Sequence, residues 1–178
     1  MDRHLLTAQL PGLRRYARAL TGNAWAADDL VQDTLERACA KWRLWVVGTN
    51  LRAWLFTLMH NLYLNQQRGA RLAQASVSID DLEDELHAPA ARSDDALDLM
   101  NCLQRLPPQQ RAVLLLVTLE DMSYEETARV LAVPVGTVMS RLSRARTRLR
   151  ELMDAAPRLA TPADSSASSM PPTLRRLK

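Results

Sequence analysis

Five arginines and no acidic residue occur in residues 136–150. Most polar side chains of this stretch recur at the spacing of one helical face, and the remaining arginines lie on its flanks. A helix fits the major groove of DNA, where an arginine can contact guanine through two hydrogen bonds or bind a phosphate. The pattern predicts a DNA-reading helix; an arginine face exposed to solvent on an ordinary bundle helix is the alternative. The predicted DNA contacts are Thr137, Ser140, Arg141, Arg144, Arg146 and Arg148.

The residues before this helix indicate how it is positioned. Ser123 and Glu126 have the spacing of a capping box, which opens a helix over residues 124–131. A four-residue connection then leads to the arginine-rich helix, whose apolar positions are 138, 142, 145, 149 and 152. Two short helices joined by a tight turn form a helix-turn-helix. Upstream, Pro108 starts a helix with a nearly continuous apolar run over residues 113–117, which predicts a central buried helix.

Apolar residues at helical spacing also predict three helices in the first 75 residues. The first ends at Gly22, the second runs from about residue 26 to 45, and the third starts at Leu51 and ends near Arg71. The expected fold is therefore all-α, with a three-helix domain at 1–75 and a helix-turn-helix domain at 94–153. A flexible acidic linker is expected at 76–93, and a disordered Pro- and Ser-rich tail at 154–178.

Length, composition and charge agree with two small helical units. At about 100–200 residues per domain, 178 residues make one ordinary domain or two very small ones. Residues 1–75 carry ten basic and five acidic side chains, and residues 101–153 carry eight basic and five acidic ones. Residues 76–100 carry one arginine and eight acids. Two basic units flanking an acidic segment point toward a polyanion such as nucleic acid.

Several function classes are disfavoured. No run of about 18 or more apolar residues and no signal-peptide pattern occurs, so we expect a cytoplasmic protein without membrane insertion. Cys39 and Cys102 are too few and too far apart for a zinc cluster, and both are expected to be small buried hydrophobic residues. The sequence has no phosphate-binding loop, dinucleotide glycine motif or HExxH, so we expect neither an enzyme nor a bound cofactor or metal.

The residues from LPPQQRAVLLLV to SRARTRLRELM resemble the C-terminal promoter-binding domain of bacterial extracytoplasmic-function (ECF) sigma factors, which are group 4 of the sigma-70 family. The segments AADDLVQDTLERACAKW and NLRAWLFTLMHNLYLNQQR resemble that family's polymerase-binding and promoter-opening segments, in the same order. The resemblance covers about residues 8–153. It implies a sigma-2-like and a sigma-4-like domain. It also implies an alternative sigma factor that binds core RNA polymerase, recognises minus-10 and minus-35 elements and helps to melt promoter DNA.

Carried over by position, the resemblance assigns three surfaces and several partners. An acidic segment matches the part that binds the clamp helices of the largest polymerase subunit. Its charge would repel DNA, which agrees with a protein partner, and a solvated helix face is the alternative. A loop and the exposed side of the third helix match the minus-10 surface; without the resemblance, the histidine there would more often be a structural or solvent-facing residue. The arginine-rich helix matches the minus-35 reader, although Met139 stands where Lys or Arg is common. A polymerase flap contact and an anti-sigma factor are also implied. The polymerase-binding residues are Asp28, Asp29, Leu30, Gln32 and Asp33, and the minus-10 residues are Gly48, Thr49, Asn50, His60, Asn61, Asn65 and Arg68.

Two other functions stay open from the sequence. A stand-alone helix-turn-helix regulator would need a ligand-binding domain, a receiver domain or a dimer interface, and the first 75 residues carry no pattern for one. An all-helical adaptor protein would use the same apolar stripes, but it gives no reason for an acid-free arginine helix. The acidic linker has two readings as well, a simple tether or a segment that competes with DNA for the arginine face.

Overall fold

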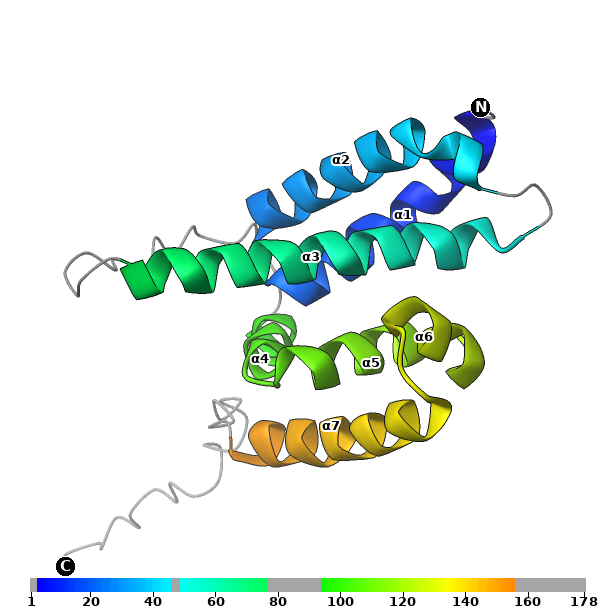
Figure 1. Cartoon of the computed structure of the whole chain (residues 1–178). Helices are drawn as coiled ribbons and strands as arrows, with labels where there is room; N and C mark the ends of the chain where they lie inside the picture. The colour runs from blue at the N-terminus through cyan, green and yellow to red at the C-terminus, as the bar shows by residue number, and fades with distance from the viewer. Residues whose placement is uncertain (1–2, 46–48, 77–93, 156–178) are drawn as a thin grey trace, which may run out of the picture.

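The computed structural model describes residues 3–45, 49–76 and 94–155, and all regular structure in these ranges is helical (Figure 1). The all-α prediction is confirmed. The elements in chain order are α1 (Arg3–Thr21), α2 (Ala24–Ala40), the short 3-10 helix η1 (Trp42–Leu44), α3 (Leu51–Ser76), α4 (Asp94–Gln104), α5 (Pro108–Thr118), α6 (Tyr124–Leu131) and α7 (Val135–Ala155).

Helices α1, α2 and α3 form the N-terminal bundle, in which α2 packs against both of the others (Figure 1). Each helix buries one apolar stripe in a shared core. Tyr16 of α1 and Phe56 of α3 meet edge to face at its centre, with ring centroids 5.2 Å apart. Burying an aromatic or aliphatic side chain of this size stabilises the fold by about 1.5–3 kcal/mol. The N-terminal bundle therefore has an apolar core of its own.

Helices α4 to α7 form the C-terminal bundle around α5 (Figure 1). The apolar run predicted to be central (113–117) is buried from Val113 to Leu116, Val117 is half-buried, and α5 packs chiefly against α7. The predicted capping box is present at the start of α6. The Ser123 hydroxyl accepts the backbone N–H of Glu126 at 3.1 Å, and the Glu126 carboxylate accepts the backbone N–H of Ser123 at 3.1 Å. Two otherwise unpaired backbone donors are thereby satisfied, which fixes where α6 begins.

The turn between α6 and α7 depends on one left-handed residue. Ala132 follows α6 with φ 53° and ψ 46°, and its N–H points back to the carbonyl groups at the end of that helix. The N–H of Val133 donates to the carbonyl of Ala128 at 3.0 Å. This closes the end of α6 and redirects the chain into α7. Glycine is the usual residue at such a position, because an alanine Cβ is strained there.

The two bundles lie against each other (Figure 1). Helix α3 packs on α6, and α1 packs on α4 and α5. The face of α3 that is not used in the N-terminal core is therefore turned toward the helix-turn-helix. The sequence predicts two domains joined by a linker, but it does not predict this contact.

Some boundaries and burials differ from the sequence prediction. The second helix does not continue to residue 45: α2 ends at Ala40, and η1 brings the ring of Trp42 to 5.0 Å from that of Trp45. The third helix continues past residue 71 to Ser76. Cys102 is buried as predicted, but Cys39 is exposed, because Ala38 takes the buried position of that turn. Gly48, the rest of the predicted linker (77–93) and residues 156–178 of the tail lie outside the described residues.

No helix within the described ranges combines the length and the apolar character needed to cross a membrane.

The left-handed turn residue gives a stability test. Ala132→Gly should raise the free energy of unfolding by about 0.5–1 kcal/mol, because glycine adopts this backbone conformation without a Cβ clash. Chemical denaturation followed by circular dichroism measures the change. Ala26→Gly, the same substitution on the exposed side of α2, is the control and should lower stability by about 0.5–1 kcal/mol. A loss of stability in Ala132→Gly would contradict the left-handed assignment.

Candidate DNA and polymerase interfaces

Helix α7 carries the predicted reading face on the side away from its core stripe. Val138, Leu142, Ala145 and Leu152 are buried and hold the helix on the C-terminal bundle. Four of the six predicted DNA contacts are exposed and two, Thr137 and Arg141, are half-buried. The exposed ones are Ser140, Arg144, Arg146 and Arg148.

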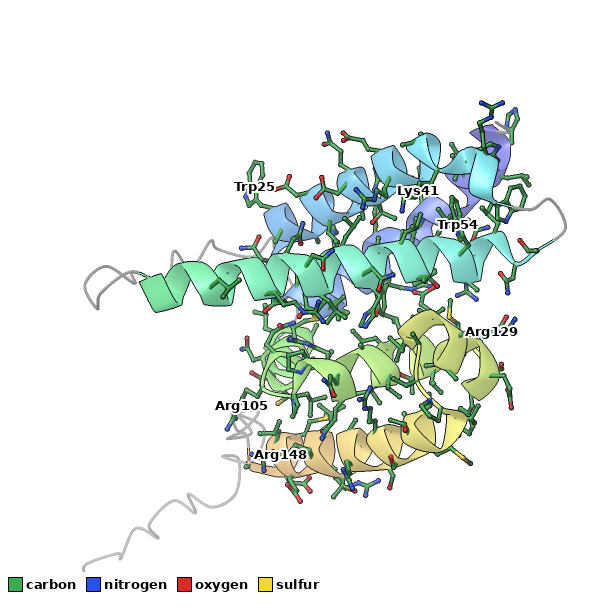
Figure 2. The ribbon with its side chains drawn as sticks, in the orientation of Figure 1. Trp25, Lys41, Trp54, Arg105, Arg129 and Arg148 are labelled. Carbon is green, nitrogen blue, oxygen red and sulfur yellow. The ribbon has the colours of Figure 1, made fainter. Side chains whose placement is uncertain are left out.

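Two of these side chains already have partners in α7. The Ser140 hydroxyl donates to the carbonyl of Thr137 at 3.1 Å. Arg148 forms an ion pair with Glu151 at 3.0 Å, between side chains that are both more than half exposed (Figure 2). Exposed pairs of this kind are weak, so Arg148 can exchange its partner for a phosphate at little cost. Met139 is 52% exposed and offers no charge to DNA.

The start of α3 holds the described part of the predicted minus-10 loop. Thr49 and Asn50 are exposed, and Gly48 lies outside the described residues. Asn50 caps α3, because its side-chain oxygen accepts the backbone N–H of Ala53 at 3.0 Å. Its side-chain amide nitrogen donates to Glu126 of α6 at 2.6 Å. One of the predicted base-reading amides is therefore bound to the other bundle.

The other predicted minus-10 residues divide between two faces of α3. Asn61, Asn65 and Arg68 are exposed and recur at helical spacing. His60 was predicted on the same exposed side, and this is wrong: it is only 7% exposed. Helix α3 turns by about 100° per residue, which places His60 on the face that looks onto the C-terminal bundle.

The environment of His60 keeps its imidazole neutral near pH 7. Burial, with a smaller contribution from the positive charge of Arg141, lowers the pKa of His60 to about 4. Its Nδ1 has no hydrogen-bond partner among the described residues. Arg141 belongs to the predicted minus-35 face, so the edge of this face comes close to the buried side of α3.

A cavity of about 540 Å³ lies at this point between α3, the start of α5 and α7. His60 and Arg68 line it from α3, and Arg141 and Arg144 line it from α7. This charge suits an anion. Within residues 3–45, 49–76 and 94–155, no group of three His, Cys, Asp or Glu side chains is placed to hold a metal ion.

The predicted polymerase-binding face lies on α2, on the outside of the N-terminal bundle. Asp28, Asp29, Gln32 and Asp33 are exposed, whereas Leu30 has no exposed surface. Leu30 therefore cannot contact a partner directly; it anchors the acidic face to the core. Asp33 accepts a hydrogen bond from Gln66 of α3 at 3.1 Å, which fixes its position.

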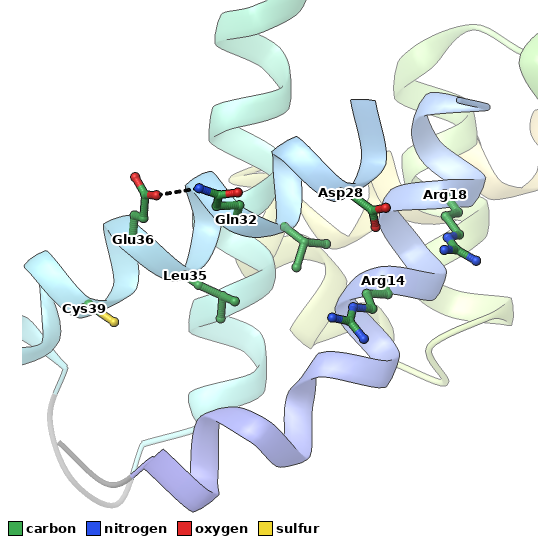
Figure 3. Close-up of a pocket in the computed structure, with 8 residues that line it drawn as sticks. Arg14, Arg18, Asp28, Gln32, Leu35, Glu36 and Cys39 are labelled. Carbon is green, nitrogen blue, oxygen red and sulfur yellow. Dashed lines mark hydrogen bonds between the residues drawn. The ribbon is translucent and has the colours of Figure 1, made fainter. Parts of the chain in front are cut away.

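A groove of about 740 Å³ runs along this face between α1 and α2 (Figure 3). Arg14 and Arg18 line it from α1, opposite Asp28. Leu35 and Cys39 contribute apolar surface farther along α2. A partner that follows the acidic face would meet both charge signs and an apolar strip.

The sequence prediction misses two residues, an exposed tryptophan beside the acidic face of α2 and a buried glutamate between the two bundles. Trp25 is 71% exposed and precedes Asp28 and Asp29 by three and four residues, so it extends the same face by one turn (Figure 2). Its position outside the apolar stripe of α2 is the signal that could have identified it.

Glu120 is fully buried against Arg15 and Arg52. No local pattern indicates that contact, because its partners are 105 and 68 residues away.

Comparison with known families gives two matches within this chain. The family described as the sigma2 domain of PhyR matches residues 6–60, and sigma-70 region 4 matches residues 96–149. The first covers most of α1 to the middle of α3, and the second covers α4 to most of α7.

Similar proteins carry a consistent description. The chain is 37% identical to the ECF RNA polymerase sigma factor EcfG of Rhodopseudomonas palustris over 155 residues, which are 83% of this chain and 82% of that protein. It is 36% identical to RNA polymerase sigma-E factor of Streptomyces coelicolor over 146 residues, 78% of each chain. Sigma factor RpoE, solved in complex with the anti-sigma factor NepR from Bartonella quintana, superposes with a TM-score of 0.75 at 37% identity, covering 86% of this chain and 97% of that one. On this evidence the chain belongs to the ECF RNA polymerase sigma factors.

Proposed function

We propose that this protein is an alternative sigma factor of group 4 that binds core RNA polymerase and directs it to specific promoters. The observation that carries the proposal is the acid-free arginine face on a capped helix-turn-helix, in a chain of this family. The role is that of a binding subunit and not of an enzyme. Because its partner polymerase acts on the chromosome, the site of action is the cytoplasm.

Promoter recognition uses α7 for the minus-35 element. The first half of α7 enters the major groove, where guanidinium groups contact guanine edges and phosphates. Arg141 and Arg144 are the side chains best placed for base contacts, because they lie one turn apart in this half of the helix. Arg146 and Arg148 bind the flanking phosphates.

Promoter opening uses α3 and the loop before it. Non-template bases of the minus-10 element leave the stack and need a polar surface that reads their edges. The exposed amides of Asn61 and Asn65 supply donors and acceptors, and Arg68 binds the backbone. Thr49 and Asn50 lie at the start of the same helix.

Polymerase binding uses the exposed acidic face of α2 against the clamp helices of the largest subunit, with the C-terminal bundle on the flap. Acids suit a protein partner here, since they would repel DNA. We add Trp25 to this face, because exposed tryptophans are enriched among residues that dominate binding energy at interfaces. The complex of the similar sigma factor RpoE with the anti-sigma factor NepR supports an anti-sigma partner for this chain too.

In vitro transcription tests the proposal as a whole. Purified full-length protein is added to bacterial core polymerase on genomic DNA, and the transcript starts are mapped. Starts that share upstream elements and depend on the added protein support the proposal. Equal transcription with and without the protein would contradict it. The recovered promoter then supplies the probe for the next two tests.

Arg141→Ala and Arg144→Ala should each weaken minus-35 recognition by about 1–3 kcal/mol, the range for a bidentate base contact. Transcription from promoters with matched and mutated minus-35 elements measures the loss. Arg105→Ala is the matched control, since it removes the same charge at the exposed end of α4 (Figure 2). Normal transcription by both α7 variants at physiological salt would show that this face is not the reader.

Reversing charge in the pair Asp28→Lys and Asp33→Lys should reduce capture of core polymerase, because both carboxylates lie on the exposed face of α2. Pull-down of core polymerase measures the effect, and binding of the free variant to promoter DNA should not weaken. Glu151→Lys on α7 is a control with the same kind of charge change far from α2. Undiminished polymerase capture by the double variant would remove α2 from the interface.

A further inference from the structure

The cavity between α3, the start of α5 and α7 gathers arginines without an acidic side chain. Arg68 lines it from α3, and Arg141 and Arg144 line it from α7. No Asp or Glu is among its lining residues. None of the three guanidiniums has a hydrogen bond or an ion pair with a side chain in the described part of the chain. Their like charges are therefore uncompensated at this cavity, which favours a bound anion.

The beginning of α5 adds positive potential from the backbone. Pro107, Pro108 and Gln109 line the cavity, and α5 begins at Pro108 without a side-chain cap. The backbone N–H groups of Gln110 and Arg111 donate to the carbonyl of Pro107, at 2.9 and 3.0 Å, which leaves the N–H of Gln109 without an intrahelical partner. The first turn of a helix carries a partial positive charge and is a common binding site for phosphate groups.

The cavity extends below the protein surface. Ala112, which has no exposed surface, and His60, which is 7% exposed, both line it. The Nδ1 atom of His60 is buried and has no hydrogen-bond partner among the described residues. Buried polar atoms are almost always paired, so an unpaired one is a place where a ligand gains a hydrogen bond. A small molecule can therefore enter this cavity more deeply than a surface contact would require.

The rest of the lining fits an organic group that is larger than a phosphate. The volume of about 540 Å³ is within the range of small-molecule sites. Leu64 and Leu131 present apolar surface, and the side-chain amides of Gln67 and Gln110 offer both hydrogen-bond donors and acceptors. A nucleobase uses both kinds of contact, because its faces are apolar and its edges carry polar atoms. Arginines beside such a surface are the combination that a nucleotide requires.

We propose that this cavity is a binding site for a nucleotide with two or more phosphates. Arg68, Arg141 and Arg144 hold the phosphates beside the start of α5, and the apolar and amide side chains hold the base. The ligand is a free small molecule and not promoter DNA, so the site goes beyond the proposed function. Its existence rests on the cavity and not on sigma activity.

The phosphate backbone of DNA is the alternative ligand for the same arginines. The shape of the site favours the nucleotide, because the three arginines reach one concave site from two different helices. A duplex presents its phosphates on a broad convex surface, which suits the exposed Arg146 and Arg148; neither of these lines the cavity. The depth marked by His60 is accessible to a small molecule and not to a duplex.

The first measurement is isothermal titration calorimetry of the full-length protein at low salt. The probes are ADP, GDP, pyrophosphate and adenosine. At least one of the two nucleotides should bind more tightly than pyrophosphate, because the base contributes contacts of its own. Adenosine should bind most weakly, since it has no phosphate for the arginines.

The second measurement repeats the nucleotide titration with Arg68→Ala and Arg144→Ala. Both side chains are exposed, so their loss does not disturb the core. Each variant should bind the nucleotide at least about tenfold more weakly, because a hydrogen bond to a charged group is lost. Arg146→Ala is the matched control: it removes the same charge from an exposed position of α7 outside the cavity. Its affinity should fall by less than about twofold, the effect of a screened charge.

The third measurement places the ligand. The imidazole resonance of His60 is followed by NMR at pH 7 and is identified by its loss in His60→Gln. The nucleotide should shift this resonance in the wild type and in Arg146→Ala. In Arg68→Ala, the same nucleotide concentration should give a much smaller shift. A short DNA duplex of arbitrary sequence should leave the resonance unchanged.

Four results would overturn the proposal. Nucleotide binding no tighter than that of pyrophosphate would reduce the cavity to a phosphate site, and an equal loss in Arg146→Ala would reduce binding to general charge attraction. An unchanged His60 resonance would place the ligand elsewhere. A shift of this resonance by the duplex, and not by the nucleotide, would make DNA the ligand. No measurement uses polymerase or a promoter, so a failure of the in vitro transcription test and a failure of the nucleotide site are distinguishable.

Discussion

One buried carboxylate determines how the two halves of this protein meet. Taking a carboxylate out of water costs several kcal/mol unless charged partners replace its hydration. Glu120 has two such partners, and both belong to the other bundle. A shift of the bundles that kept Glu120 buried but moved it away from Arg15 and Arg52 would leave its charge without compensation. The position of α5 relative to α1 and α3 is therefore set by electrostatics as well as by apolar packing.

Other electrostatic features of the molecule oppose this arrangement. Arg141 and Arg144 of α7 line the same cavity as Arg68 of α3, which places like charges near one another. The neutral state of His60 lowers that repulsion, since the imidazole does not add its own charge near pH 7. The N-terminal bundle and the arginine-rich stretch of α7 are basic, as a protein that binds a polyanion requires. The ion pairs of Glu120 act against this repulsion.

Local patterns in the sequence predict the helices well, because a helix is set by its own stripe and caps. The capping box at Ser123 and the apolar run of α5 lie where the pattern places them. The errors arise where contacts between helices, and not the local pattern, determine which side chains are buried. Leu30 sits in a motif assigned to a surface but points into the core, and His60 belongs to a face covered by the other bundle. The contact of Glu120 joins residues 105 and 68 positions apart, and no local pattern carries information over that separation. The family resemblance assigns the polymerase-binding, minus-10 and minus-35 surfaces, but it does not predict how these surfaces lie relative to one another.

The contact between Asn50 and Glu126 joins two helix beginnings through atoms that the caps leave free. Asn50 uses its oxygen to cap α3 and only its amide nitrogen to reach α6. Glu126 uses Oε2 to close the capping box of α6 and only Oε1 to accept that nitrogen. Breaking this one hydrogen bond therefore leaves both caps intact, so a substitution that removes it should not unravel the first turn of either helix.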